Sequence, residues 1–77
     1  MPVYHLNIVS DENFEDTEGG HFADIDAARR EAVLTARQMM GDAIYRGYLP
    51  LKDEIHILND HGELVEIVLF SQAVESH

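Results

Sequence analysis

Hydrophobic and polar residues alternate near both ends of the chain, and this alternation predicts the strands of a sheet. Residues 3–9, VYHLNIV, are rich in β-branched and aromatic residues and alternate with a period of two. Residues 54–70 contain two further runs of this kind, separated by Asp60-His61-Gly62. Because glycine readily adopts the positive φ of a short hairpin loop, we expect these two runs to form an antiparallel hairpin.

Between the predicted strands the pattern changes to that of a helix. Apolar residues recur every three or four positions from Ile25 to Ala43, and several of them are alanines, which favour helices. Asp24 suits the N-cap because its carboxylate accepts a hydrogen bond from the first turn. We expect one helix that ends near Arg46, with Gly47 as its C-terminal cap.

A short second strand around Phe14–Thr17 is expected to complete a hairpin with the first strand, although its residues have poor strand propensity. The order of elements is then ββαββ, which predicts a two-layer α+β fold: an antiparallel sheet with one long helix packed on one face. We expect a single domain over residues 1–70 and a frayed tail over residues 71–77. A helix of about 22 residues, about 33 Å long, should overhang strands of about 23 Å.

Strand alternation assigns the strand residues to two faces of the sheet. The face toward the helix is expected to hold Tyr4, Leu6, Ile8, Ile55, Ile57, Val65, Ile67 and Leu69. The opposite face has no second helix to cover it, and its apolar residues are Val3, Val9, Leu58, Leu64, Val68 and Phe70. Because exposed apolar patches mark interaction sites, we expect these six residues to form an interface.

Composition narrows the classes of function. Fifteen acidic residues against five basic ones give a formal net charge of -10, which disfavours binding to nucleic acid. There is no cysteine, so disulfides and cysteine-based zinc sites are excluded. No apolar run approaches the roughly 18 residues of a membrane span, and no signal peptide is recognisable. We expect a cytoplasmic protein, unprocessed apart from loss of Met1, with no membrane or nucleic-acid partner.

The acidic run NFEDTEGGHF, residues 13–22, is the strongest candidate for a metal-binding loop. An EF-hand loop requires glycine at its sixth position and a bidentate glutamate at its twelfth. If the loop starts at Asp11, these positions hold Asp16 and Phe22, so the match fails. We therefore interpret the acidic run as part of a hairpin followed by a turn into the helix. We expect no metal-binding, cofactor-binding or catalytic residue in the chain.

Other candidate chemistry is sparse. His5 and His56 share the uncovered face, but two imidazoles are only half of a zinc site. No serine lies in a nucleophile-elbow motif. Four of the five basic residues lie on the predicted helix: Arg29, Arg30, Arg37 and Arg46. Pairing at i,i+4 with Asp26 and Asp42 would make them a solvated face, whereas a functional interpretation makes them a docking stripe for an acidic partner or RNA.

Three segments resemble one family. They are MPVY at the first strand, DTEGGHFADIDAARREA at the turn into the helix, and NDHGELVEIVLF at the last hairpin. Together they are similar to short uncharacterised bacterial proteins that share a domain of unknown function, over nearly all of residues 1–70. The resemblance implies the fold but no activity, cofactor or catalytic residue. A looser likeness is to HicB-type antitoxin domains, which also run hairpin, helix and strand.

These observations favour a small, non-enzymatic protein-interaction or regulatory module that forms a homodimer through its helix-free face. Replacing Phe70 with glutamate should then give a soluble monomer. One alternative is an antitoxin-like acidic protein that masks a basic partner through the first hairpin. Another is a protein that binds a metal or small ligand with the same acidic hairpin.

Overall fold

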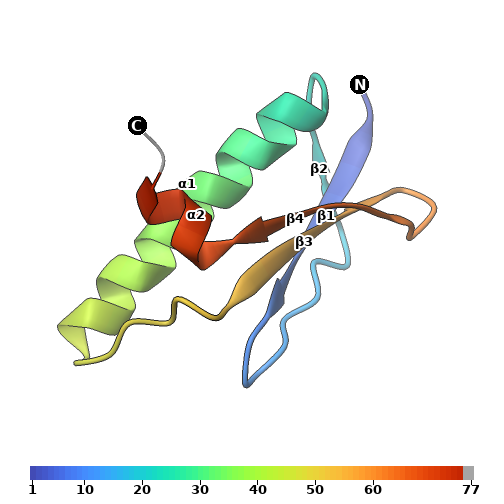
Figure 1. Cartoon of the computed structure of the whole chain (residues 1–77). Coiled ribbons are helices and arrows are strands. Elements are labelled where there is room, and N and C mark those ends of the chain that lie inside the picture. The colour runs from blue at the N-terminus through green and yellow to red at the C-terminus, as the bar shows by residue number, and fades with distance from the viewer. Residues whose placement is uncertain (76–77) are drawn as a thin grey trace.

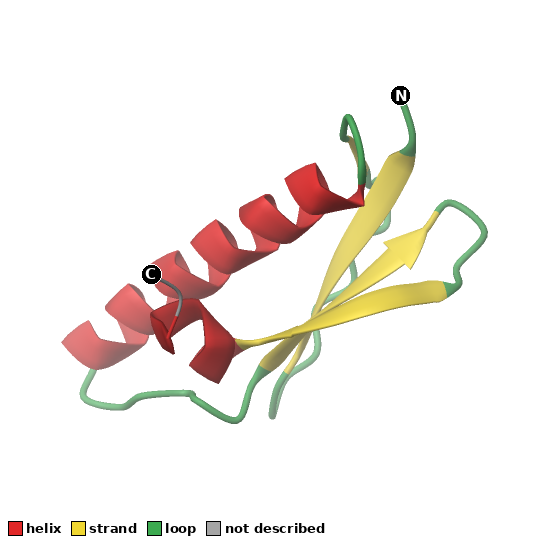
Figure 2. Ribbon diagram, turned by 45° about the horizontal axis from the view of Figure 1, so that its top comes forward, coloured by secondary structure: helices red, strands yellow, loops and turns green. Residues whose placement is uncertain are grey.

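The computed structural model describes residues 1–75 (Figure 1). Its elements are β1 (Val3–Val9), β2 (Gly20–His21), α1 (Ile25–Tyr45), β3 (Glu54–Asn59), β4 (Leu64–Leu69) and α2 (Phe70–Glu75). The strands form one antiparallel sheet in the order β2-β1-β3-β4, and α1 packs on one of its faces (Figure 2). The α+β class and the antiparallel sheet with one long helix are confirmed. Neither helix in residues 1–75 is long and apolar enough to cross a membrane.

The long helix begins and ends where the sequence predicts. The Asp24 carboxylate accepts a hydrogen bond from the Ala27 N–H at 2.8 Å, which makes Asp24 the N-cap. At the other end the N–H groups of Gly47 and Tyr48 donate to the carbonyls of Ile44 and Ala43, both at 3.0 Å. This pair of bonds is the Schellman motif, in which Gly47 follows the last helical turn with positive φ. The C-terminal end of α1 extends past the sheet, as its length predicts (Figure 1).

The predicted strand around Phe14–Thr17 is wrong. Phe14 forms only an isolated bridge with Ile8, with backbone bonds of 2.8 and 3.0 Å, and the second strand is instead β2. Between the bridge and β2, the Asp16 carboxylate accepts the Leu6 N–H at 3.3 Å. A side chain therefore takes the place of a neighbouring strand along the middle of β1, as short acidic side chains do when they compete with backbone carbonyls.

The core lies between α1 and the helix-facing side of β1, β3 and β4. Its fully buried helix residues are small: Ala28, Ala32 and Ala36. Small side chains let the helix approach the sheet closely, so that the larger Ile55 and Ile57 of β3 fill the space between the layers. The predicted inward faces of β1 and β3 are confirmed, because their residues pack against this core.

The predicted phase of β4 is wrong by one residue. Ile67 is 41% exposed, whereas Val68 is 3% exposed and Phe70 is fully buried. Val68 lies directly opposite Ile55, and residues opposite each other in a ladder share a face of the sheet. A register shift opposite Ile57 and Leu58 further interrupts the alternation in this hairpin.

Burial of Phe70 also overturns the outcome expected for its replacement. Phe70 is the first residue of α2, and its N–H donates to the Asp53 carbonyl at 3.0 Å. A glutamate there would place an unpaired carboxylate in the core, so loss of folding replaces the soluble monomer as the expected result. The expected frayed tail is likewise wrong for residues 71–75, which belong to α2; residues 76 and 77 lie outside the described part of the chain.

Candidate functional site

The helix-free side of the sheet is an uncovered surface made by three strands. Four of the six residues expected there, Val3, Val9, Leu58 and Leu64, do lie on this side by register, whereas Val68 and Phe70 are in the core. Three residues that the sequence placed under the helix join them. We call this surface the open face, and its apolar residues are Val3, Val9, Leu58, Leu64, Val65, Ile67 and Leu69.

Few carboxylates lie at the open face, and one of them, Asp60 of the last hairpin loop, is 3.6 Å from His5 Nε2. Among the strand residues that line it, Glu54 has the single carboxylate, and that carboxylate lies 2.7 Å from His56 Nε2. Asn7, opposite His56 in the ladder, adds an uncharged polar group. In a chain of net charge -10, most carboxylates therefore lie elsewhere.

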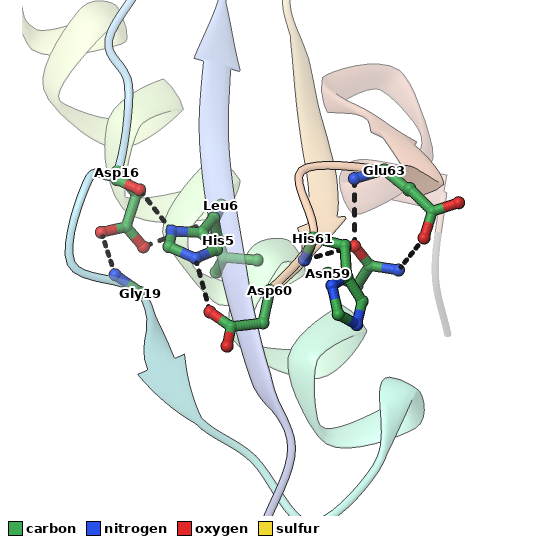
Figure 3. Close-up of polar contacts among 8 residues, drawn as sticks. All are labelled: His5, Leu6, Asp16, Gly19, Asn59, Asp60, His61 and Glu63. Atoms are coloured by element: carbon green, nitrogen blue, oxygen red, sulfur yellow. Dashed lines mark hydrogen bonds and ion pairs between the residues drawn. The ribbon is translucent and has the colours of Figure 1, made fainter.

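The two histidines that β1 and β3 contribute to the open face, His5 and His56, are bound separately. His5 Nδ1 lies 2.7 Å from the Asp16 carbonyl oxygen, and its Nε2 lies 3.6 Å from the Asp60 carboxylate (Figure 3). The hydrogen bond to the Asp16 carbonyl, with a smaller contribution from Asp60, raises the pKa of His5 above its usual 6.5. His56 lies opposite Asn7 rather than His5. Residues 1–75 contain no cluster of three potential ligands that could hold a metal ion.

Asp16 explains the acidic run that the sequence singles out. Its carboxylate accepts the N–H groups of Leu6 and Gly19 (Figure 3), and its own N–H donates to Asn7 Oδ1 at 2.9 Å. Gly19 has φ +75°, and a Cβ there would lie 2.8 Å from Val3 Cγ1, so only glycine fits this turn. Asp16 and Gly19 thus build a turn against β1, which agrees with the structural interpretation of the run.

The overhanging end of α1 contains a feature that the sequence did not predict. A hollow of about 730 Å³ lies between the segment after the helix and the first loop, with Phe14, Met39 and Tyr48 in its lining. Burial, with a smaller contribution from the charge of Asp11, raises the pKa of Asp53 at its wall. The sequence feature that could have indicated this hollow is the apolar run YLPL, residues 48–51, which belongs to no strand.

The helix arginines form other contacts than the predicted i,i+4 pairs. Asp26 pairs with Arg29 at 2.7 Å rather than with Arg30, and Arg29 also donates to Glu66 on β4 at 2.8 Å. The predicted pair of Asp42 with Arg46 is absent among the described side chains. The positive charge of the helix arginines is therefore only partly neutralised by carboxylates of the helix itself.

Comparison with known proteins bears on the family of the chain. No curated protein and no solved structure shows a significant match to the chain. The sequence does match the family described as "Domain of unknown function (DUF6894)" over residues 3–71, as the resemblance in the three segments predicts. Because the match covers most of the chain, the protein belongs to this family.

Proposed function

We propose that the protein is a non-enzymatic protein-interaction module that self-associates through the open face. The single observation that supports this proposal is the exposure of Val65, Ile67 and Leu69 at 45%, 41% and 37% on a sheet surface that no element of the described chain covers. Apolar groups gathered on one surface gain free energy when a partner removes them from water.

A second copy is the occupant that best fits the charge of this face. Two copies of net charge -10 repel each other, so they can associate only where carboxylates are few. The open face meets this condition because Glu54, the one carboxylate of its strand residues, is already paired with His56, and the Asp60 carboxylate of the hairpin loop lies 3.6 Å from His5 Nε2. A two-fold contact would place the apolar strips of both copies against each other.

The size of the face limits the strength of the dimer. Three strands of six or seven residues span about 20 Å by about 15 Å, or about 300 Å² in projection. A standard stable interface buries roughly 800 Å² per partner. We therefore expect a weak, concentration-dependent dimer with a Kd in the micromolar range or above.

Sedimentation equilibrium from 5 µM to 1 mM tests this proposal, with Ile67→Glu as the disrupting variant. Leu34→Glu is the matched control, because Leu34 is also exposed but lies on α1, away from the open face. We expect Ile67→Glu to raise the dimer Kd at least tenfold and Leu34→Glu to change it less than twofold. Salt should strengthen the wild-type dimer by screening the repulsion between copies. A monomer at every concentration, or equal effects of the two variants, would refute the proposal.

A further inference from the structure

A second hollow, of about 520 Å³, runs along the side of α1 that faces β4 and α2. Two contacts fix its position: Arg29 Nε donates to Glu66 of β4 at 2.8 Å, and Arg37 Nε donates to the Ala73 carbonyl of α2 at 2.9 Å. Because β4 is an edge strand, the hollow lies beside the outer edge of the sheet. We call it the arginine groove, and its lining residues are Asp26, Arg29, Arg30, Val33, Leu34 and Arg37.

The charge of the arginine groove is opposite to that of the chain. The chain has fifteen acidic and five basic residues, yet three of the five basic residues line the groove with one acidic residue. Arg30 and Arg37 form no ion pair with any carboxylate whose position the structure describes. Leu34, which is 53% exposed, adds an apolar wall between them. The groove therefore attracts carboxylates that also bring some apolar surface.

The neighbouring edge of β4 has backbone groups free to pair. Phe70 N–H donates to Asp53 on the β3 side, and donors alternate along an antiparallel strand, so the N–H groups of Ile67 and Leu69 point outward. Gln72 Oε1 accepts the Leu69 N–H at 2.9 Å, whereas residues 1–75 provide no strand beyond β4 to pair with Ile67. Such an edge is a template for an added strand.

We propose that the arginine groove and the outer edge of β4 together bind an extended acidic segment of a partner protein, which adds to the sheet as a fifth strand. Its backbone pairs with the N–H and C=O groups of Ile67. Side chains of a strand point alternately to the two faces of the sheet. Every second side chain of the added strand therefore faces α1, where a carboxylate meets Arg30 or Arg37. This surface uses the backbone of Ile67 rather than its side chain, which belongs to the open face, so the inference goes beyond self-association.

Two other occupants fit the groove less well. A second copy that paired β4 with β4 about a two-fold axis would bring both arginine grooves to one side of the joined sheet, where Arg30 and Arg37 would approach their equivalents. The β4 strand of a second copy would also bring no free carboxylate to the groove. The one carboxylate that β4 presents on this side belongs to Glu66, which is already bonded to Arg29. Nucleic acid needs many phosphate contacts, which the net charge of -10 opposes.

The probe is a seven-residue peptide, blocked at both ends, in which glutamate alternates with valine. The first control peptide replaces glutamate with lysine, and the second carries N-methyl groups on alternate backbone amides, which prevents strand pairing without changing charge. Arg30→Glu tests the groove because Arg30 forms no ion pair in the described structure. Arg46→Glu is its matched control, with the same change of charge at the C-cap of the same helix, outside the groove.

Calorimetric titration in 50 mM salt, with amide chemical shifts of ¹⁵N-labelled protein, gives the result. We expect the glutamate peptide to bind, to shift the Ile67 amide and to lose affinity in 300 mM salt. Arg30→Glu should weaken binding at least tenfold, as should N-methylation of the peptide, while Arg46→Glu should change it less than threefold. Absence of binding, equal binding of the lysine peptide, or equal effects of the two arginine variants would overturn the proposal.

Discussion

The outer edge of β1 and the outer edge of β4 differ in how their backbone groups are satisfied. The edge of β1 is closed by three contacts in turn. They are the two-residue strand β2, the isolated bridge at Ile8 and the carboxylate of Asp16. Along β4, the one such contact in the described structure is the bond from the Leu69 N–H to Gln72. Edge strands left open invite strand addition, and proteins normally protect them. The contrast supports the proposal that the outer edge of β4 binds an extended segment, whereas the contacts along β1 stabilise the sheet.

The largest effect is expected from removing the anchor that holds β4 in the sheet. β4 has a partner strand on one side only, so its position depends on the burial of Val68 and Phe70 under α1. Phe70→Ala should lower the free energy of unfolding by about 3–5 kcal/mol, measured by urea denaturation. Leu69→Ala, on the exposed side of β4 next to Phe70, should cost less than half as much. Equal losses would contradict the phase of β4.

A smaller effect is expected at the closed edge. Asp16→Ala leaves the N–H groups of Leu6 and Gly19 without their acceptor, which should cost about 1–3 kcal/mol in the free energy of unfolding. Asp11→Ala removes an exposed carboxylate that pairs only with Lys52, at 3.4 Å, and should cost less than about 0.5 kcal/mol. If the two variants lose the same stability, Asp16 does not close the edge.

The smallest effect is a pH dependence from His5, whose ring contacts the carbonyl of the same Asp16. Its folded-state pKa is raised above 6.5, so its stabilising contribution is complete below pH 6.5 and is lost as pH rises through the folded-state value. Unfolding free energies measured from pH 5.5 to 8.5 should therefore fall more steeply in the wild type than in His5→Gln. Parallel pH profiles would show that the bond at Asp16 does not favour the protonated ring.

The closed edge was only partly predictable from sequence. The first strand, the helix with its Asp24 and Gly47 caps, and the last hairpin follow from local periodicity and turn chemistry, and they are confirmed. The strand expected at Phe14–Thr17 failed because Asp16 bonds across the chain to Leu6, a contact ten residues away in the sequence. Side-chain contacts of this kind leave no periodic signal.

The open edge was predicted with its two faces reversed, for a different physical reason. The run LVEIVL followed by Phe70 is apolar in both phases, so alternation alone cannot tell which side is buried. The register with β3 and the burial of Phe70 in α2 decide it, and both are tertiary contacts. The arginine groove likewise depends on α2, because Arg37 bonds to the Ala73 carbonyl, and the sequence had indicated a tail there.

The contrast between the two edges is tested most directly by hydrogen exchange of single amides, followed by NMR at neutral pH. We expect slow exchange of the amide of Leu6, which is bonded to Asp16, and of the amide of Val68, which points toward β3, but fast exchange of the Ile67 amide on the outer edge of β4. Adding the glutamate–valine peptide should slow Ile67 alone among the three. An Ile67 amide that is already as protected as Val68 in dilute protein would contradict the open edge.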